Sequence, residues 1–157
     1  MNVTHEQFLS KAIDLASENP EKGGGPFGAI IVKDGEVIAQ AVNTVTRDND
    51  PTAHAEINAI RMACKKLKRF ELNDCILYSS CEPCPMCLGA IYWARLGALY
   101  FAANKEDAAH VGFDDSFIYS ELKLPVEQRS IPTYKLSMED ALVPFENWDH
   151  REDKIEY

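Results

Sequence analysis

The sequence contains no long apolar run and no leader-like start. Its longest apolar stretches reach about half the length that a membrane-spanning helix needs. The first twenty residues lack a basic stretch followed by an apolar one, so we expect no secretory signal and a cytoplasmic location. The 157 residues are 46% hydrophobic, which excludes a mainly disordered or collagen-like chain and suits one domain over residues 1–157.

Positive charge is also scarce. Lys and Arg number 16 against 25 Asp and Glu, which leaves a formal net charge of −9. Proteins that bind the nucleic-acid backbone need clustered Lys and Arg, whereas the one basic cluster, residues 65–69, falls at the end of a predicted helix. We therefore expect a small-molecule substrate, no nucleic-acid partner and no membrane partner.

The cysteine count argues against a disulfide framework. Five cysteines are an odd number, and the sequence shows no secretory signal. Cys81, Cys84 and Cys87 fall within seven residues, which is typical of a metal site. Cys64 and Cys75 sit in apolar patterns and are predicted to be small core residues.

Hydrophobic periodicity predicts an α/β fold. Thr4 and Gln7 form a capping-box pattern before a helix that ends near Glu18, and Asp34-Gly35 marks a tight turn between two strands. From residue 53 onward helix and strand alternate, which implies parallel strands with helices covering the sheet. The predicted strands are 27–33, 36–46, 75–79 and 98–102, and the predicted later helices are 53–69, 84–95 and a weak one at 138–148.

Two short segments carry a metal-ligand pattern. His54-Ala55-Glu56 and Pro83-Cys84-Pro85-Met86-Cys87 each open a predicted helix. One His and two Cys supply three zinc ligands, and a catalytic zinc keeps its fourth position for water. The spacing of Cys84 and Cys87 places both thiolates in a first helical turn, where the helix N-terminus favours them.

Glu56 distinguishes a catalytic site from a structural one. A structural zinc site needs no carboxylate beside its histidine, whereas a metal-activated water needs a proton acceptor. Glu56 lies roughly 200° from His54 around an ideal helix, so both can approach one metal only at the N-terminal end. We therefore predict that Glu56 is catalytic.

The cysteine spacing alone leaves the ligand set open. Cys81 and Cys84 form a C-x-x-C pair that overlaps the pair Cys84 and Cys87. A structural zinc site with His54 and all three cysteines is therefore an alternative, although it leaves Glu56 unexplained. Such a site belongs in a non-catalytic, zinc-stabilised binding module.

The pairing of HAE with PCxxC resembles the signature of the zinc nucleobase and nucleoside deaminases, the cytidine deaminase-like superfamily. A narrower resemblance, to the bacterial guanine deaminases, covers nearly the whole chain. It rests on GGPFGAIIVKDG (24–35), NDPTAHAE (49–56), SCEPCPMCLGAIYWAR (80–95), GFDDSFIY (112–119) and the terminal Tyr157. The last two motifs carry the narrower assignment.

The resemblance implies a three-layer αβα sandwich around a five-stranded mixed sheet. It implies one Zn²⁺ per subunit, held by His54, Cys84 and Cys87, with Cys81 left out. The implied reaction is the hydrolytic deamination of guanine to xanthine and ammonia, in purine catabolism or salvage. A zinc-activated hydroxide would attack C2, and Glu56 would be the proton shuttle.

The resemblance also assigns residues to the substrate. Phe27 would stack on the purine, Asn43 would hydrogen-bond to it, and the Ala55 backbone would add a contact. Asp115 would contact the ring or assist proton transfer. Taken alone, Asn43 is conspicuous within an apolar strand because a buried amide needs partners, whereas Phe27 equally fits an ordinary core aromatic.

The C-terminal residue receives a role by resemblance as well. Related guanine deaminases exchange C-terminal segments between two subunits, which implies a homodimer here with residues about 138–157 exchanged. Tyr157 would then close the active site of the partner, although the last residue of a chain is usually frayed.

Other deaminases remain alternatives. The substrate could be guanosine, cytosine or cytidine, while a tRNA adenosine deaminase is disfavoured by the net charge of −9. Ammonia release from a panel of bases and nucleosides separates these enzymes from a binding module.

Overall fold

The computed structural model describes residues 4–157, which divide between two compact units, residues 4–115 and Ser116–Tyr157. The first unit holds the sheet and most of the helices, and the second holds short helices joined by irregular chain. Within residues 4–157 no helix combines the length and apolar character that crossing a bilayer requires.

The first unit is built on one mixed sheet with the strand order β2-β1-β3-β4. β1 pairs antiparallel with β2 and β3, whereas β3 and β4 are parallel, as the alternating pattern predicted. Asp34 and Gly35 have positive φ angles and form the predicted tight turn between β1 and β2. The strands are β1 (Gly28–Lys33), β2 (Glu36–Val42), β3 (Cys75–Cys81) and β4 (Ala98–Ala103).

The predicted number of strands is wrong. The described part of the chain forms four strands rather than five, because the chain passes from β4 directly into α5 (Lys105–His110). The irregular stretch 129–142 of the second unit also joins no ladder.

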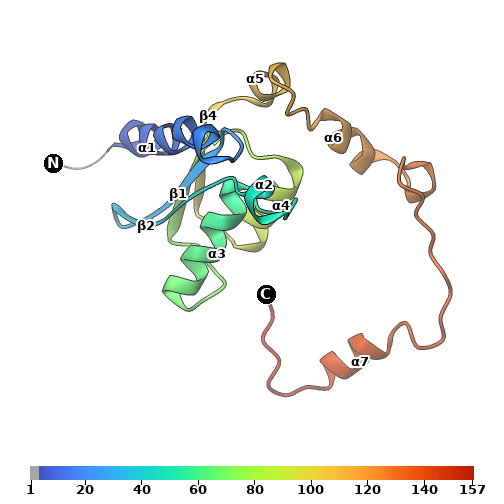
Figure 1. Ribbon diagram of the computed structural model, residues 1–157. Helices are drawn as coiled ribbons and strands as arrows, with labels where there is room; N and C mark the ends of the chain where they lie inside the picture. The colour runs from blue at the N-terminus through green and yellow to red at the C-terminus, as the bar shows by residue number, and fades with distance from the viewer. Residues whose placement is uncertain (1–3) are drawn as a thin grey trace. The chain divides into compact units, whose positions relative to one another are not determined.

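The layers follow from the period-two alternation along the strands. On β1, Ile30 and Val32 pack in one cluster with Phe8 of α1 (His5–Glu18). Ala29 and Ile31 belong to the other cluster, which also holds residues of α3 (Ala55–Leu67) and α4 (Pro85–Trp93). Figure 1 shows α1 and α3 on different sides of the strands. The predicted three-layer αβα arrangement is confirmed for this unit.

Helix α1 begins and ends where the sequence indicates. Thr4 and Gln7 form the predicted capping box, and the helix ends at Glu18. A short 3₁₀ turn, η1 (Pro20–Lys22), follows and leads into the glycine-rich loop before β1.

Several element boundaries differ from the prediction by a few residues, and two of these differences affect the site. β2 ends at Val42 rather than at residue 46, because the chain turns into the short helix α2 (Val45–Asp48). α3 begins at Ala55 rather than at residue 53, because His54 has an extended backbone and is the N-cap. Asn43 and His54 therefore lie just outside regular elements.

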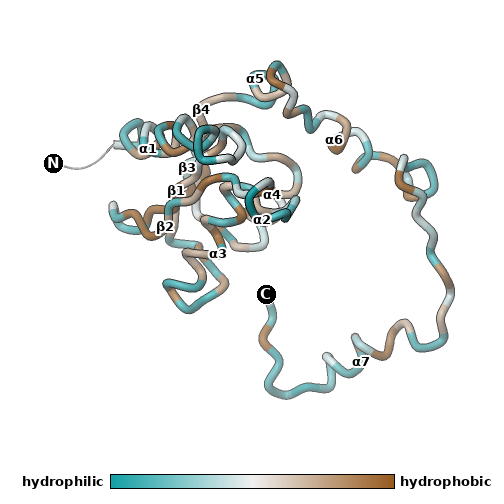
Figure 2. Tube along the Cα trace, viewed as in Figure 1, coloured by the Kyte–Doolittle hydropathy of each residue, from teal (hydrophilic) through white to brown (hydrophobic). Residues whose placement is uncertain are grey.

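The second unit contains α6 (Ser116–Lys123), η2 (Val126–Gln128) and α7 (Val143–Asp149). The weak helix predicted over 138–148 is thus shorter than expected. Figure 2 shows apolar residues distributed along this unit among polar ones. Its exposed apolar side chains include Ile131, Tyr134, Leu136, Phe145 and Tyr157.

Candidate active site

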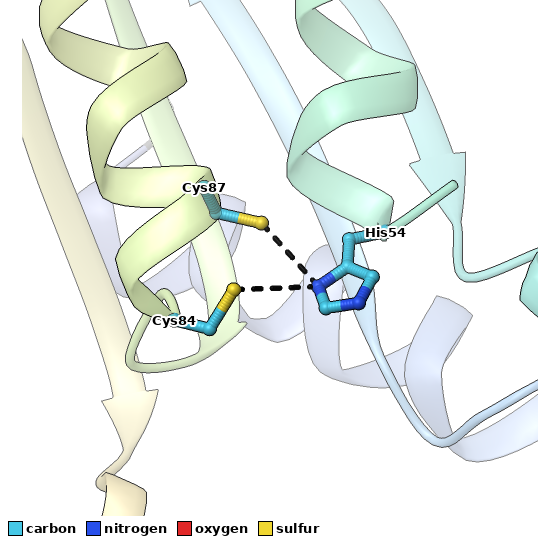
Figure 3. Close-up of side chains that lie close together, drawn as sticks. All are labelled: His54, Cys84 and Cys87. Atoms are coloured by element: carbon cyan, nitrogen blue, oxygen red, sulfur yellow. Dashed lines mark hydrogen bonds between the residues drawn. The ribbon is translucent and has the colours of Figure 1, made fainter. Parts of the chain in front are cut away.

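The starts of two helices bring the three predicted zinc ligands together. His54 is the N-cap of α3, Cys84 is the N-cap of α4, and Cys87 lies in the first turn of α4. One potential ligand atom from each residue lies within 4.8 Å of the others. Figure 3 shows the three side chains pointing toward one another, with His54 Nδ1 3.5 Å from both sulfur atoms.

The electrostatics of this group favour a thiolate beside an imidazole. A hydrogen bond from the Cys87 thiol is the largest cause that lowers the pKa of Cys84 to about 4, and His54 lowers it further. The same pairing raises the pKa of Cys87, and the hydrogen bond with the Cys84 sulfur is the largest cause that raises the pKa of His54. Two sulfurs and one imidazole nitrogen that converge in this way fit the donor set that zinc prefers.

Cys81 is not part of this group. Its thiol donates to the carbonyl oxygen of Asn104 at 3.6 Å, and burial raises its pKa to about 11. The metal-binding group in residues 4–157 therefore has three members rather than four. The geometry supports a site with three protein ligands, His54, Cys84 and Cys87, and not the structural site with four.

Glu56 lies beside the ligands in the first turn of α3. Its side chain is buried, and the Ser79 hydroxyl donates to Oε1 at 2.9 Å. The Cys87 thiol contacts Oε2 at 3.4 Å. Burial is the largest cause that raises the pKa of Glu56, although these hydrogen bonds oppose the shift. Burial therefore disfavours the charged form of this carboxyl group.

Asn43 has a defined orientation at the end of β2. Its side chain is buried, and Oδ1 accepts from the backbone N–H groups of Gly25 at 3.4 Å and Val45 at 3.2 Å. Because N–H groups only donate, they identify the oxygen end of the amide. The amide nitrogen is the end that remains for another partner.

The remaining predicted substrate residues have different settings. The Phe27 ring lies just before β1 and meets Phe113 edge to face, with 4.9 Å between centroids. Ala55 is fully buried at the start of α3. Partial burial raises the pKa of Asp115, and the negative charge of Cys84 adds to the shift. Tyr157 is exposed and belongs to the second unit.

A cavity of about 370 Å³ borders Phe27 on the side of α1 and α5. Ser80 and Cys81 line it, but none of the three metal-group residues does. Its walls are mainly apolar, which gives a polar base few partners. We therefore do not assign this cavity to the reaction site.

Sequence reasoning missed Ser79. This residue is buried in β3 and contacts both Glu56 and the carbonyl oxygen of Cys81, at 2.7 Å. The available signal was a hydroxyl within a strand predicted to be buried, since buried polar groups need hydrogen-bond partners.

The chain is similar to known deaminases. Residues 2–103 match the cytidine and deoxycytidylate deaminase zinc-binding region. The chain is 58% identical to guanine deaminase of Bacillus subtilis over 156 residues, which are 99% of this chain and 100% of that protein. The X-ray structure of the B. subtilis protein matches with a TM-score of 0.97 over 99% of each chain.

A second group of relatives matches a smaller part of the chain. A tRNA-specific adenosine deaminase of Aquifex aeolicus is 47% identical over 98 residues, which are 62% of this chain and 65% of that protein. The match to the zinc-binding region agrees with the three-ligand group and the adjacent buried Glu56. The chain belongs to the cytidine and deoxycytidylate deaminase zinc-binding family.

Proposed function

We propose that this protein catalyses the hydrolytic deamination of guanine to xanthine and ammonia. The observation that carries the proposal is the extent of similarity to guanine deaminase of B. subtilis. That similarity covers 99% of the chain, whereas the tRNA-specific adenosine deaminase of A. aeolicus covers 62%. Residues 104–157, beyond the zinc-binding region, therefore favour guanine as the substrate.

His54, Cys84 and Cys87 would hold one zinc ion in this enzyme. When bound, zinc supplies a Lewis acid that lowers the pKa of a water molecule to about 7. The three side chains leave a fourth position for other ligands, because Cys81 points to a different partner.

Glu56 would carry protons between the attacking water and the base. A bond forms between the water oxygen and C2, and the bond from C2 to the exocyclic amine breaks. Glu56 accepts a proton from the water and donates it to a ring nitrogen. It then takes the proton of the new C2 hydroxyl and donates it to the departing amine, which leaves as ammonia while the C2 carbonyl forms. The raised pKa of Glu56 suits this exchange, and Ser79 holds its carboxyl group in place.

Recognition of the base would come from residues around Asn43. Phe27 would stack on the purine ring, and Asn43 would donate a hydrogen bond to an acceptor atom of the base. The Ala55 backbone would add a contact. Asp115 would contact the ring or assist proton transfer, in keeping with its raised pKa.

We further propose a single-domain subunit, 1–157, that forms a homodimer with exchanged C-terminal segments, about 138–157. Tyr157 would close the partner's active site. The exposed large apolar side chains of the second unit support this proposal, because packing against a second subunit would remove them from water. A cytoplasmic location and a role in purine catabolism or salvage complete the proposal.

The runner-up is deamination of adenosine in tRNA. The 47% identity over 98 residues to the A. aeolicus enzyme favours it. The net charge of −9 opposes it, since binding to a nucleic-acid backbone depends on cationic groups.

A substrate panel tests the proposal directly. Ammonia release and zinc content are measured with guanine, guanosine, cytosine, cytidine, adenine and an adenosine-containing tRNA. We expect release from guanine far above the others. Release from the tRNA alone would support the runner-up, and no release by the zinc-loaded protein would favour a binding module.

A further inference from the structure

Asn19 carries a buried amide outside the residues assigned so far. It caps the C-terminal end of α1, and its residue is only 1% exposed. Its Nδ2 donates to the carbonyl oxygens of Gly25 at 2.7 Å and Asn43 at 2.8 Å. Arg47 donates to Oδ1 at 3.3 Å. Both ends of the amide are therefore engaged.

These bonds close a ring through two residues proposed to contact the base. The Gly25 carbonyl also accepts from the backbone N–H of Phe27 at 2.8 Å, and the Phe27 carbonyl accepts from the backbone N–H of Asn43 at 3.1 Å. The Asn43 carbonyl then accepts from Asn19. One buried side chain thus links the backbones that carry Phe27 and Asn43.

The ring is packed without spare room. A Cβ atom on Gly24 would lie 2.3 Å from Asn19 Nδ2 and 2.4 Å from the carbonyl oxygen of Asn43. Such distances are far below ordinary van der Waals contact, so the close approach requires glycine at this position. A loop packed in this way has little freedom to alter the position of Asn43.

The same loop determines which end of the Asn43 amide meets a ligand. The N–H groups of Gly25 and Val45 occupy its oxygen, which leaves its nitrogen as a hydrogen-bond donor. A donor suits an acceptor atom of a purine, either a ring nitrogen or a carbonyl oxygen.

We propose that Asn19 is a positioning residue for substrate recognition. It holds the backbones of Phe27 and Asn43 so that Asn43 presents its amide nitrogen to an acceptor atom of the base. This inference rests on the proposed function, and Asn19 acts through Asn43 rather than on the base itself.

A double-mutant cycle with Asn19→Ala and Asn43→Ala tests this role in the zinc-loaded enzyme. Asn19→Ala is expected to raise KM for guanine about tenfold, with a smaller change in kcat and unchanged zinc content. In the Asn43→Ala background the same substitution is expected to change KM less than about twofold, because the Asn43 amide that Asn19 positions is no longer present. Independent, multiplicative effects would overturn the proposal.

Thr4→Ala is the matched control, because Thr4 caps the other end of α1 through a hydrogen bond to Gln7. It is expected to lower thermal stability without changing KM. If Asn19→Ala also lowers stability and leaves KM unchanged, Asn19 is merely structural and the proposal fails.

If Asn19→Ala does not fold, Arg47→Ala decides the question, because Arg47 is exposed and contributes one bond to Asn19 Oδ1. A rise in KM of about two- to threefold supports the proposal, and an unchanged KM overturns it. Lack of guanine turnover by the wild-type protein is a separate result. It overturns the proposed function, and the role of Asn19 falls with it.

Discussion

The proposed reaction residues and the proposed recognition residues are positioned in different ways. His54, Cys84, Cys87 and Glu56 lie at the starts of two helices, whose caps and dipoles favour charged ligands. Phe27 and Asn43 lie at loop ends, joined by backbone bonds and by the Asn19 amide. Helix starts suit a reaction centre shared by a family, whereas loops can change with the substrate.

Removing the metal should cause the largest loss and should affect only the reaction residues. Chelation is expected to abolish measurable deamination, and added zinc is expected to restore it, because His54, Cys84 and Cys87 form the metal group. Activity and bound zinc are measured together during the titration. Full activity of zinc-free protein would contradict the assignment.

Glu56→Gln separates proton transfer from metal binding. We expect kcat to fall by roughly 10²- to 10⁴-fold, since a glutamine cannot carry the proton. Zinc content should stay at the wild-type level, because Glu56 is not one of the three ligands. Near-normal kcat in a zinc-loaded variant would remove Glu56 from the mechanism.

Deleting Tyr157 tests whether the recognition residues extend into a second subunit. Activity is expected to fall about tenfold or more with zinc content intact, because the contacts by which Tyr157 would close the active site over the substrate are lost. Mixing subunits that lack Tyr157 with Glu56→Gln subunits then shows whether Tyr157 acts in its own subunit or in the partner. Exchanged segments would rebuild one complete site and recover activity, whereas no recovery on mixing would place Tyr157 in its own subunit's site or outside the site.

Ser79→Ala should slow the reaction without weakening substrate binding. Ser79 donates to Glu56 Oε1, so its loss is expected to lower kcat about tenfold while KM and zinc content change little. Tyr78→Phe is the matched control. It also removes a hydroxyl group from β3, but that hydroxyl contacts His5 rather than Glu56. Equal effects of the two variants on kcat would show that Ser79 has only a structural role.

Asp74→Asn should have the smallest effect and should change stability rather than activity. The Lys33 ammonium and the Arg69 guanidinium hold the pKa of Asp74 below its ordinary value. A lowered folded-state pKa stabilises the protein above about pH 4, the unfolded value, and this contribution is lost as pH falls further. Denaturation of both proteins across pH 2–7 checks whether their difference shrinks in acid.

The sequence indicated both segments of the metal group because the spacing within each segment is local. Cys84 and Cys87 are three residues apart at a helix start, and Glu56 follows His54 within one turn. Such short spacings constrain geometry whatever the rest of the fold does. The pairing of His54 with Cys84 and Cys87, 30 and 33 positions away, came instead from the resemblance to the zinc deaminases.

The recognition residues were harder to predict because their partners are distant in sequence. Asn43 was expected inside a strand, but β2 ends one residue before it. Asn19 reaches Asn43 across 24 positions, and Ser79 reaches Glu56 across 23, so no local pattern records either bond. The count of five strands came from the resemblance, whereas the hydrophobic period predicted the four strands that the described residues form.

The most direct test of the central claim is product formation from guanine by the zinc-loaded protein. We expect xanthine and ammonia in equal amounts from the wild-type protein, with both lost in Glu56→Gln protein that still holds zinc. Zinc-loaded wild-type protein that leaves guanine unchanged, or equal product from both proteins, would contradict it.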